Sequence, residues 1–368
     1  MSYFQNISLN NYRNFLNSNF EFGKGSNIII GRNGSGKTNI LESISLFQKG
    51  RGFRKDNINN LINFKSNNKH FKIRSIFYYD KSTLNISVFS YEKNHNFIKK
   101  ILVNESSTLE SIKHLENLLS IIYFLPEMER LFVSSPSARR NFLDRIIYTY
   151  DKKYHLLINN YKKSLYERQQ LLKNIQYDSE WITNLEKNIV NYGIEIYKKR
   201  IYHIEIINLK LEQLNILKNF SHKINFKIED KFLLDNKDIL SNNMEKYFLT
   251  LKFNRKLDFL SNKCNVGPHK SDIVGYSLDN NININQFSTG QQKTVVLLII
   301  LAQCKFLIDD INLKPILLLD EVCSHLDDNN RELLLHISDL LDVQIFMTGS
   351  EKNFFSFLST KATYCNII

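Results

Sequence analysis

Cysteine, proline and long apolar stretches are scarce in this chain of 368 residues. The cysteines at positions 264, 304, 323 and 365 form no Cys-x-x-Cys pair, so we expect ordinary buried thiols in a reducing compartment. The longest uninterrupted apolar run, residues 295–302, is too short to cross a bilayer. The first residues lack the basic and apolar regions of a signal peptide. The sequence therefore predicts a soluble cytoplasmic protein without a membrane partner.

Acidic residues are outnumbered as well. The chain has 37 Asp and Glu against 49 Lys and Arg, which gives a formal net charge of +12. A basic surface suits a phosphate-rich partner such as DNA. The chain is also rich in Asn, Ile and Lys, and such a bias raises the net charge without any selection for binding. Charge alone therefore leaves a nucleic-acid partner open.

A complete phosphate-loop motif is present. Residues 31–38 fit G-x-x-x-x-G-K-S/T, after a β-branched run over 27–30 and before a helical apolar pattern over 39–46. In this strand–loop–helix context, backbone N–H groups surround the phosphates of a nucleotide. Lys37 should reach the β- and γ-phosphates and Thr38 should bind Mg²⁺. A plain glycine turn is a poor alternative. The predicted ATP contacts in this segment are Gly31, Arg32, Asn33, Gly34, Ser35, Gly36, Lys37, Thr38 and Asn39.

The apolar periodicity divides the chain into blocks. Residues 71–103 alternate like a β-meander, and helical spacing then runs from about 109 to 214. Strand patterns return near 223–229 and 272–278, followed by a helix from 288 to about 307 and a continuous apolar strand over 316–319. We expect a discontinuous α/β domain, 1–108 with 218–368, and an inserted helical domain over 109–217 that folds as a hairpin or small bundle.

The apolar strand over 316–319 ends in two carboxylates, Asp320 and Glu321. In a phosphate-loop ATPase, an aspartate here completes the Mg²⁺ shell with Thr38, and the next glutamate activates the attacking water. With Lys37, these two residues are the predicted catalytic set. An acidic strand end at a turn is the alternative, and the loop at 31–38 makes it less attractive.

A further motif opens the helix at 288. Residues 287–292 read Phe-Ser-Thr-Gly-Gln-Gln and resemble the signature motif of ABC-type ATPases. Ser288, Gly290 and Gln291 would then contact the γ-phosphate that a partner subunit holds. A polar helix cap explains the same residues equally well in isolation. Residues 324–327, Ser-His-Leu-Asp, match the D-loop pattern at the dimer seam of such enzymes.

The order of these motifs resembles the SMC-like branch of ABC ATPases. Finer strings resemble the RecF family of bacterial recombination and repair proteins, and the resemblance covers residue 9 to about 349. In this family a basic residue and two acidic residues usually follow Gly-Pro-His, whereas here Ser271 separates Lys270 from Asp272. Another departure is that no switch histidine follows the last strand, so Thr348 or Ser350 is expected near the γ-phosphate. The strings are Tyr12-Arg13-Asn14-Phe15, 50–54, 124–127, 135–144, 267–270 and 288–292.

The resemblance implies an ABC-type phosphate-loop ATPase lobe, a mixed sheet with helices, carrying an inserted α-helical lobe. It implies a homodimer that closes over two ATP–Mg²⁺, hydrolyses ATP slowly in a DNA-dependent way, and clamps double-stranded DNA at gaps. It also implies action with RecO and RecR in loading RecA. Each basic side chain could instead be a solvated charge, and 139–140 could pack within the helical lobe. The implied DNA contacts are Arg51, Arg54, Lys55, Arg139 and Arg140.

Other functions remain to be weighed. Another SMC-like ATPase of chromosome maintenance fits the same motifs, although a long tether needs coils that the chain lacks. The ATPase subunit of a membrane transporter would carry a switch histidine and a Q-loop, and neither is clear here. A small-molecule kinase would not need residues 288–292. A fused nuclease is not expected, because only about forty residues follow position 327.

Overall fold

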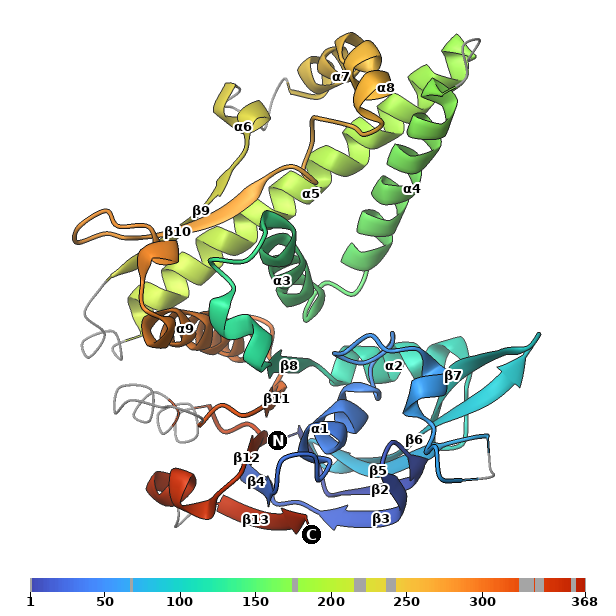
Figure 1. Cartoon of the computed structure of the whole chain (residues 1–368), viewed down its shortest axis with the longest axis vertical. Helices are drawn as coiled ribbons and strands as arrows, with labels where there is room; N and C mark the ends of the chain where they lie inside the picture. The colour runs from blue at the N-terminus through green and yellow to red at the C-terminus, as the bar shows by residue number, and fades with distance from the viewer. Residues whose placement is uncertain are drawn as a thin grey trace. The chain divides into compact units, whose positions relative to one another are not determined.

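The computed structural model describes residues 2–66, 69–173, 178–214, 223–235, 243–323, 334, 341–358 and 362–367. They form two compact units, which we call unit 1 (Met1–Glu129 with Lys293–Ile368) and unit 2 (Arg130–Gln292) (Figure 1). The bounds differ from the predicted domains at both ends of the insertion. The segment over 109–129 stays in unit 1 because its strand joins the sheet there, and the segment over 223–292 stays in unit 2 because its strands pair with each other.

A five-stranded parallel sheet forms the centre of unit 1, in the order β13-β4-β12-β11-β8. Strands β8, β11 and β12 are buried at every residue, as expected for strands covered on both faces. Because parallel strands end at one edge, the phosphate loop after β4 and the carboxylates after β11 share that edge. The strands are β4 (Ser26–Gly31), β8 (Ile121–Phe124), β11 (Ile316–Leu319), β12 (Ile345–Gly349) and β13 (Ala362–Ile367).

The antiparallel strands of unit 1 form a separate sheet, in the order β3-β2-β5-β6-β7 with β1 also paired to β5. The predicted β-meander over 71–103 is confirmed as β5, β6 and β7. The predicted α/β class is confirmed, although parallel and antiparallel pairings lie in two sheets and not in one mixed sheet. The strands are β1 (Ser2–Phe4), β2 (Asn6–Tyr12), β3 (Phe15–Glu21), β5 (Lys72–Tyr79), β6 (Ser82–Lys93) and β7 (Asn96–Val103).

Three helices belong wholly or largely to unit 1: α1 (Lys37–Ser45), α2 (Leu109–Leu118) and α9 (Thr289–Asp309). Helix α9 is the one described helix whose length and composition would allow it to cross a membrane. Its apolar run over 295–302 is buried at every position, which is typical of a core helix in a globular unit. Short 3-10 helices lie at Ile58–Leu61, Pro126–Arg130, Ile284–Gln286 and Lys352–Leu358.

Unit 2 is built on a long helix pair. Helices α4 (Tyr154–Leu172) and α5 (Ser179–Gln213) lie side by side (Figure 1), and Asp178 caps α5 by accepting hydrogen bonds from the backbone N–H groups of Glu180 and Trp181. At about 1.5 Å per residue, α5 is roughly 50 Å long. A short antiparallel pair, β9 (Ile224–Glu229) and β10 (Asp272–Ser277), completes the unit. The other helices are α3 (Pro136–Tyr148), α6 (Lys231–Asp235), α7 (Asn243–Phe253) and α8 (Arg255–Ser261).

Candidate nucleotide-binding site

The phosphate loop runs from the end of β4 at Gly31 to the start of α1 at Lys37. Gly34 and Gly36 have φ angles of 82° and 109°, a backbone conformation that L side chains rarely adopt. A Cβ atom on Gly36 would also lie 2.5 Å from the side-chain nitrogen of Asn14, which donates a 2.7 Å hydrogen bond to the carbonyl of Ser35. The glycines and the Tyr12–Phe15 string therefore fix the loop together.

Lys37 lies over this loop with only 4% of its side chain exposed. Its Nζ donates hydrogen bonds to the carbonyls of Gly31 (2.9 Å) and Arg32 (3.2 Å) and lies 3.3 Å from Glu321 Oε1. These contacts direct the ammonium group across the loop. An ammonium held there by neutral carbonyls is suited to neutralising phosphate oxygens.

Asp320 follows β11 directly and is buried. Its Oδ1 accepts hydrogen bonds from Thr38 Oγ1 (3.0 Å) and Thr348 Oγ1 (2.7 Å). Burial raises the pKa of the Asp320 carboxyl, and the two hydroxyl donors oppose that rise. A carboxylate and a hydroxyl side by side are the hard oxygen ligands that Mg²⁺ takes from such sites, where phosphates and water complete the shell. No cluster of three potential His, Cys, Asp or Glu ligands occurs among the described residues.

Glu321 has a positive φ angle of 48°, which is uncommon for a residue other than glycine. Its N–H donates a 2.8 Å hydrogen bond to Thr348 Oγ1, and the same hydroxyl donates to Asp320. Thr348, on β12, thus joins the two acidic residues. The sequence placed Thr348 or Ser350 near the γ-phosphate but missed this link. A hydroxyl at the carboxyl end of the neighbouring parallel strand was the available signal.

A buried carboxylate behind the loop is a second feature that sequence reasoning missed. Glu42, on α1, is fully buried and accepts hydrogen bonds from Tyr12 Oη (3.0 Å), Arg13 Nε (2.9 Å) and Arg13 Nη2 (2.8 Å). Arg54 Nη1 donates to Asn39 Oδ1 (2.8 Å) and approaches Glu42 Oε2 at 3.4 Å. The Tyr12–Phe15 string therefore anchors α1, and the exposed Arg54 connects the 51–55 segment to the same helix.

The proposed signature residues lie at the start of α9, where the boundary between the units also falls. The Ser288 N–H donates to Gln291 Oε1 (2.9 Å), and the Gln291 N–H donates to Ser288 Oγ (3.3 Å). This reciprocal pair is a capping box, the alternative that the sequence left open. Gly290 lies in the same turn. The D-loop match at 324–327 lies outside the described residues.

The candidate DNA contacts fall into two groups. Arg51, Arg54 and Lys55 are exposed in unit 1. Arg139, in contrast, is buried and is fully engaged within unit 2. Its Nε and Nη2 bond the carboxylate of Asp272 at 2.8 and 2.7 Å, and its Nη1 donates to two backbone carbonyls, those of residues 132 and 134. The geometry favours the packing alternative for Arg139.

The Arg140 guanidinium is only partly available for a DNA contact. Its Nη1 donates a 2.6 Å hydrogen bond to the carbonyl of Ser271. Burial, and then the positive charge of Arg200, lower the pKa of the Arg140 guanidinium, although it stays protonated at any physiological pH. Ser271 itself donates to the carbonyl of Pro268, so the departure noted at this position belongs to the packing of the 267–272 segment.

The chain is similar to known proteins over nearly its whole length. The family described as the RecF/RecN/SMC N-terminal domain matches residues 3–364. The DNA replication and repair protein RecF of Rickettsia typhi is 33% identical over 349 residues, which cover 95% of this chain and 94% of that protein. The protein of the same name from Rickettsia conorii is 32% identical over 363 residues, which cover 98% of both chains.

Solved structures give the same result. The recombination mediator protein RecF-ATPrS of the RecFOR pathway superposes with a TM-score of 0.83 at 28% identity and covers 96% of this chain and 94% of that one. RecF-ATP gives a TM-score of 0.81 at 28% identity, with 95% and 92% covered. An SMC head bound to the C-winged helix domain of ScpA shares the fold, with a TM-score of 0.55 at 17% identity and 96% and 91% covered. The family match, the relatives and the arrangement at the phosphate loop together show that the chain belongs to the RecF family of SMC-like ABC ATPases.

Proposed function

We propose that the protein is a slow, DNA-dependent ATPase whose two copies close over two ATP molecules and hold double-stranded DNA at gaps. One observation carries this proposal: Lys37, Thr38, Asp320 and Glu321 converge at one edge of a parallel sheet, although some 280 residues separate the two pairs. A relative of known structure in the RecFOR pathway was solved with ATP. By that likeness we infer a role with RecO and RecR in supporting RecA loading.

The chain's own groups divide the work of hydrolysis. The loop N–H groups and Lys37 bind the triphosphate and neutralise its charge. Thr38 Oγ1 and Asp320 hold Mg²⁺, which withdraws charge from the phosphate oxygens when it is bound. Glu321 orients the attacking water, and its backbone is held in place by Thr348.

The second copy completes each site in this proposal. Ser288, Gly290 and Gln291 would turn a helix N-terminus toward the γ-phosphate that the first copy holds, so that ATP joins the two chains. The exposed residues Arg51 and Lys55, with Arg54, would contact DNA phosphates, which gives salt-sensitive and largely sequence-independent binding. Because Arg54 also bonds Asn39, the DNA-binding segment is continuous with the helix that starts at Lys37.

Sedimentation velocity of the Glu321→Gln variant tests the proposal. We expect a monomer without nucleotide, a dimer with ATP and Mg²⁺, and a larger complex when a gapped duplex is added. The matched control is Glu351→Gln, an exposed acid just after β12, which should sediment like the unaltered protein. A Glu321→Gln chain that binds ATP but remains a monomer at every concentration would contradict the sandwich.

A further inference from the structure

A groove on unit 2 is lined mostly by residues outside the predicted nucleotide and DNA contacts. Its volume is 770 Å³, and it is lined by α7, by Leu257 of α8, by the start of α6 and by the segment over 265–270. Helix α7 contributes Lys246, Leu249, Thr250 and Phe253. These positions are spaced i, i+3, i+4 and i+7, so they form one stripe along the helix. The groove therefore has one continuous helical wall.

Leu249 and Phe253 of this stripe, together with Leu257 of α8, form an exposed apolar surface. Tyr247 and Leu251, on another face of α7, are fully buried and attach the helix to its unit. Leu249, Leu257 and Phe253, in contrast, are 41%, 53% and 83% exposed. Single exposed apolar side chains are ordinary, but several that line one hollow mark a surface that gains by being covered. The groove therefore offers an apolar floor to another molecule.

Three lysines surround this floor: Lys231, Lys246 and Lys270. All are exposed, and none of them forms an ion pair with any residue in the described part of the chain. The one carboxylate in the lining, Asp230, is occupied: it accepts from Tyr197 Oη (3.0 Å) and caps α6 through two backbone N–H groups. The charge that the groove presents is therefore positive.

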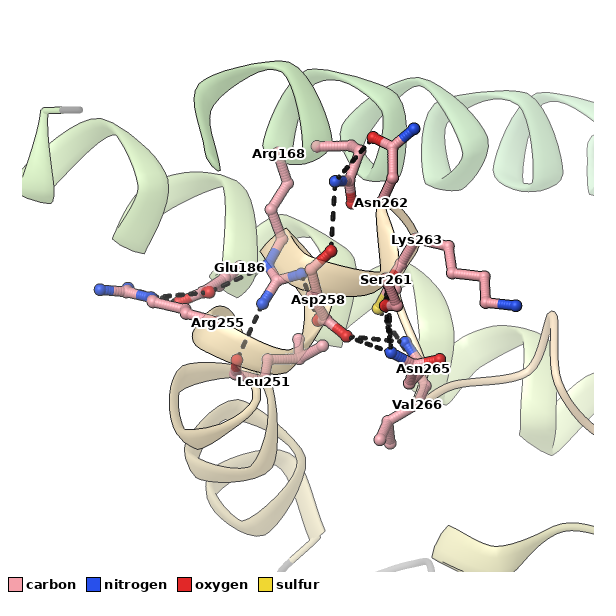
Figure 2. Close-up of polar contacts among 12 residues, drawn as sticks. Arg168, Glu186, Leu251, Arg255, Asp258, Ser261, Asn262, Lys263, Asn265 and Val266 are labelled. Atoms are coloured by element: carbon pink, nitrogen blue, oxygen red, sulfur yellow. Dashed lines mark hydrogen bonds and ion pairs between the residues drawn. The ribbon is translucent and has the colours of Figure 1, made fainter. Parts of the chain in front are cut away.

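A network of hydrogen bonds and ion pairs connects α4, α7 and α8 with the groove residue Asn265 (Figure 2). Asp258, fully buried on α8, accepts 3.0 and 2.9 Å hydrogen bonds from the backbone and side-chain nitrogens of Asn265, which lines the groove. Arg168 of α4 bonds Asp258 (2.7 Å) and the carbonyl of Leu251 at the end of α7 (2.8 Å). A preformed wall of this kind reduces the entropy that a ligand must lose on binding.

We propose that this groove binds an acidic segment of a protein partner, with carboxylates on Lys231, Lys246 and Lys270 and apolar side chains over Leu249 and Phe253. Charge complementarity selects the acidic ligand, and the exposed apolar floor selects a protein over duplex DNA, whose outer surface is phosphate and sugar. The inference goes beyond the proposed ATPase cycle and does not depend on it.

Fluorescence anisotropy with a labelled synthetic peptide, Asp-Asp-Phe-Asp-Asp-Leu-Leu-Asp-Phe, tests the groove on the full chain. We expect saturable binding that falls about tenfold in the Lys246→Glu/Lys270→Glu variant and by a similar factor in Phe253→Ser. The charge-reversed variant should gain affinity for the same peptide with lysine in place of aspartate. Matched controls are Lys252→Glu/Lys256→Glu and Met244→Ser, which alter exposed residues of α7 and α8 outside the groove and should leave binding unchanged.

Several results would overturn the inference. One is equal binding of the aspartate and lysine peptides, or of a peptide with alanine in place of phenylalanine and leucine. Another is an equal loss of peptide affinity in the groove variants and in their control variants. A third is a charge-reversed variant that keeps its affinity for the peptide but loses affinity for duplex DNA. That result would assign the lysines to the DNA-binding surface. The replaced side chains are exposed, so the variants should fold, and thermal unfolding checks this.

Discussion

Two buried arginines of unit 2 are paired with carboxylates, whereas Lys37 and Asp320 at the phosphate loop of unit 1 are held mainly by neutral groups. Arg168 bonds both Glu186 (3.0 Å) and Asp258 (2.7 Å), and Arg200 bonds Asp144 through two nitrogens at 2.8 Å. Lys37 is held by backbone carbonyls, and its nearest carboxylate is a partly exposed one at 3.3 Å.

This difference shows that burial of a charge does not by itself identify a functional site. A buried ion pair with short, bidentate contacts has no capacity left for a ligand, and its removal costs stability. A buried charge held by carbonyls or hydroxyls can exchange those contacts for phosphate or magnesium. The type of partner therefore separates the two kinds of buried charge, and the following variants test that separation.

Arg168→Ala should produce the largest change in stability. It leaves two fully buried carboxylates, Glu186 and Asp258, with reduced pairing, and breaking a buried pair of this kind costs about 3–5 kcal/mol. Urea unfolding of unit 2 measures the loss. Lys163→Ala, which removes an exposed pair with Glu167, should cost less than about 0.5 kcal/mol. Equal losses of unfolding free energy in Arg168→Ala and Lys163→Ala would contradict the structural role given to the buried ion pairs.

His269 should make unit 2 sensitive to acid. Its Nδ1 faces Tyr161 Oη at 2.7 Å and its Nε2 faces the carbonyl of Cys264 at 2.9 Å, so both nitrogens are used by the neutral ring. Burial lowers the pKa of His269 from 6.5 to about 4. The unfolded chain therefore takes up the proton first, and stability falls as pH drops below 6.5, by about 3 kcal/mol once pH reaches the folded-state pKa.

Unfolding free energies measured across this pH range check the prediction. His269→Gln keeps one donor and one acceptor but does not titrate, so it should remove most of the loss. His95→Gln, at a fully exposed histidine, is the control and should leave the profile unchanged. A wild-type profile that His269→Gln does not flatten would count against this assignment.

Arg139→Ala and Arg54→Ala should separate packing from DNA binding. Arg139→Ala breaks the ion pair with Asp272 and should cost about 2 kcal/mol of stability while leaving DNA affinity unchanged. Arg54→Ala should scarcely change stability but should weaken binding to duplex DNA. The slope of the logarithm of the binding constant against the logarithm of the salt concentration should fall in magnitude by about one. Titrations of duplex at several salt concentrations measure both. If Arg139→Ala weakened DNA binding and Arg54→Ala lowered stability, Arg139 would be the DNA contact and Arg54 the packing residue.

Asp320→Asn should change stability only slightly, and with the opposite sign to Arg168→Ala and Arg139→Ala. Because burial raises the pKa of Asp320, its charged form costs the folded state stability at neutral pH. The neutral amide should therefore raise the unfolding temperature slightly while it removes Mg²⁺-dependent hydrolysis. Thr363→Val, in the edge strand β13, is a control that should leave hydrolysis intact. A lower unfolding temperature would show that the carboxylate stabilises the fold.

Much of the site was readable from local pattern. The phosphate loop is contiguous, and the pair Asp320–Glu321 follows a strand whose apolar run indicates a parallel sheet, so sheet geometry alone brings Thr38 and Asp320 together. The RecF resemblance was confirmed by relatives and solved structures.

What the sequence missed depends on contacts between distant segments. Thr348 was expected near the γ-phosphate, but its bonds to Asp320 and Glu321 cross between two strands. Glu42 is bonded by side chains about thirty residues earlier, so it carries no local signal. The sequence left Arg139 open between a DNA contact and packing, and its bonds to the distant Asp272 favour packing. The compact units have other bounds than the predicted domains, because among the described strands β9 and β10 pair with each other and not with the sheets of unit 1.

Sedimentation velocity of a mixture of two inactive chains tests the central claim most directly. In the Glu321→Gln background, Lys37→Ala removes ATP binding and Ser288→Arg blocks the surface that should meet the partner's nucleotide, so each chain alone should remain a monomer with ATP and Mg²⁺. An equimolar mixture can form one intact site, from the Lys37 of one chain and the Ser288 of the other, and we predict an ATP-dependent heterodimer. A mixture that remains monomeric, while Glu321→Gln alone dimerises, would contradict the account.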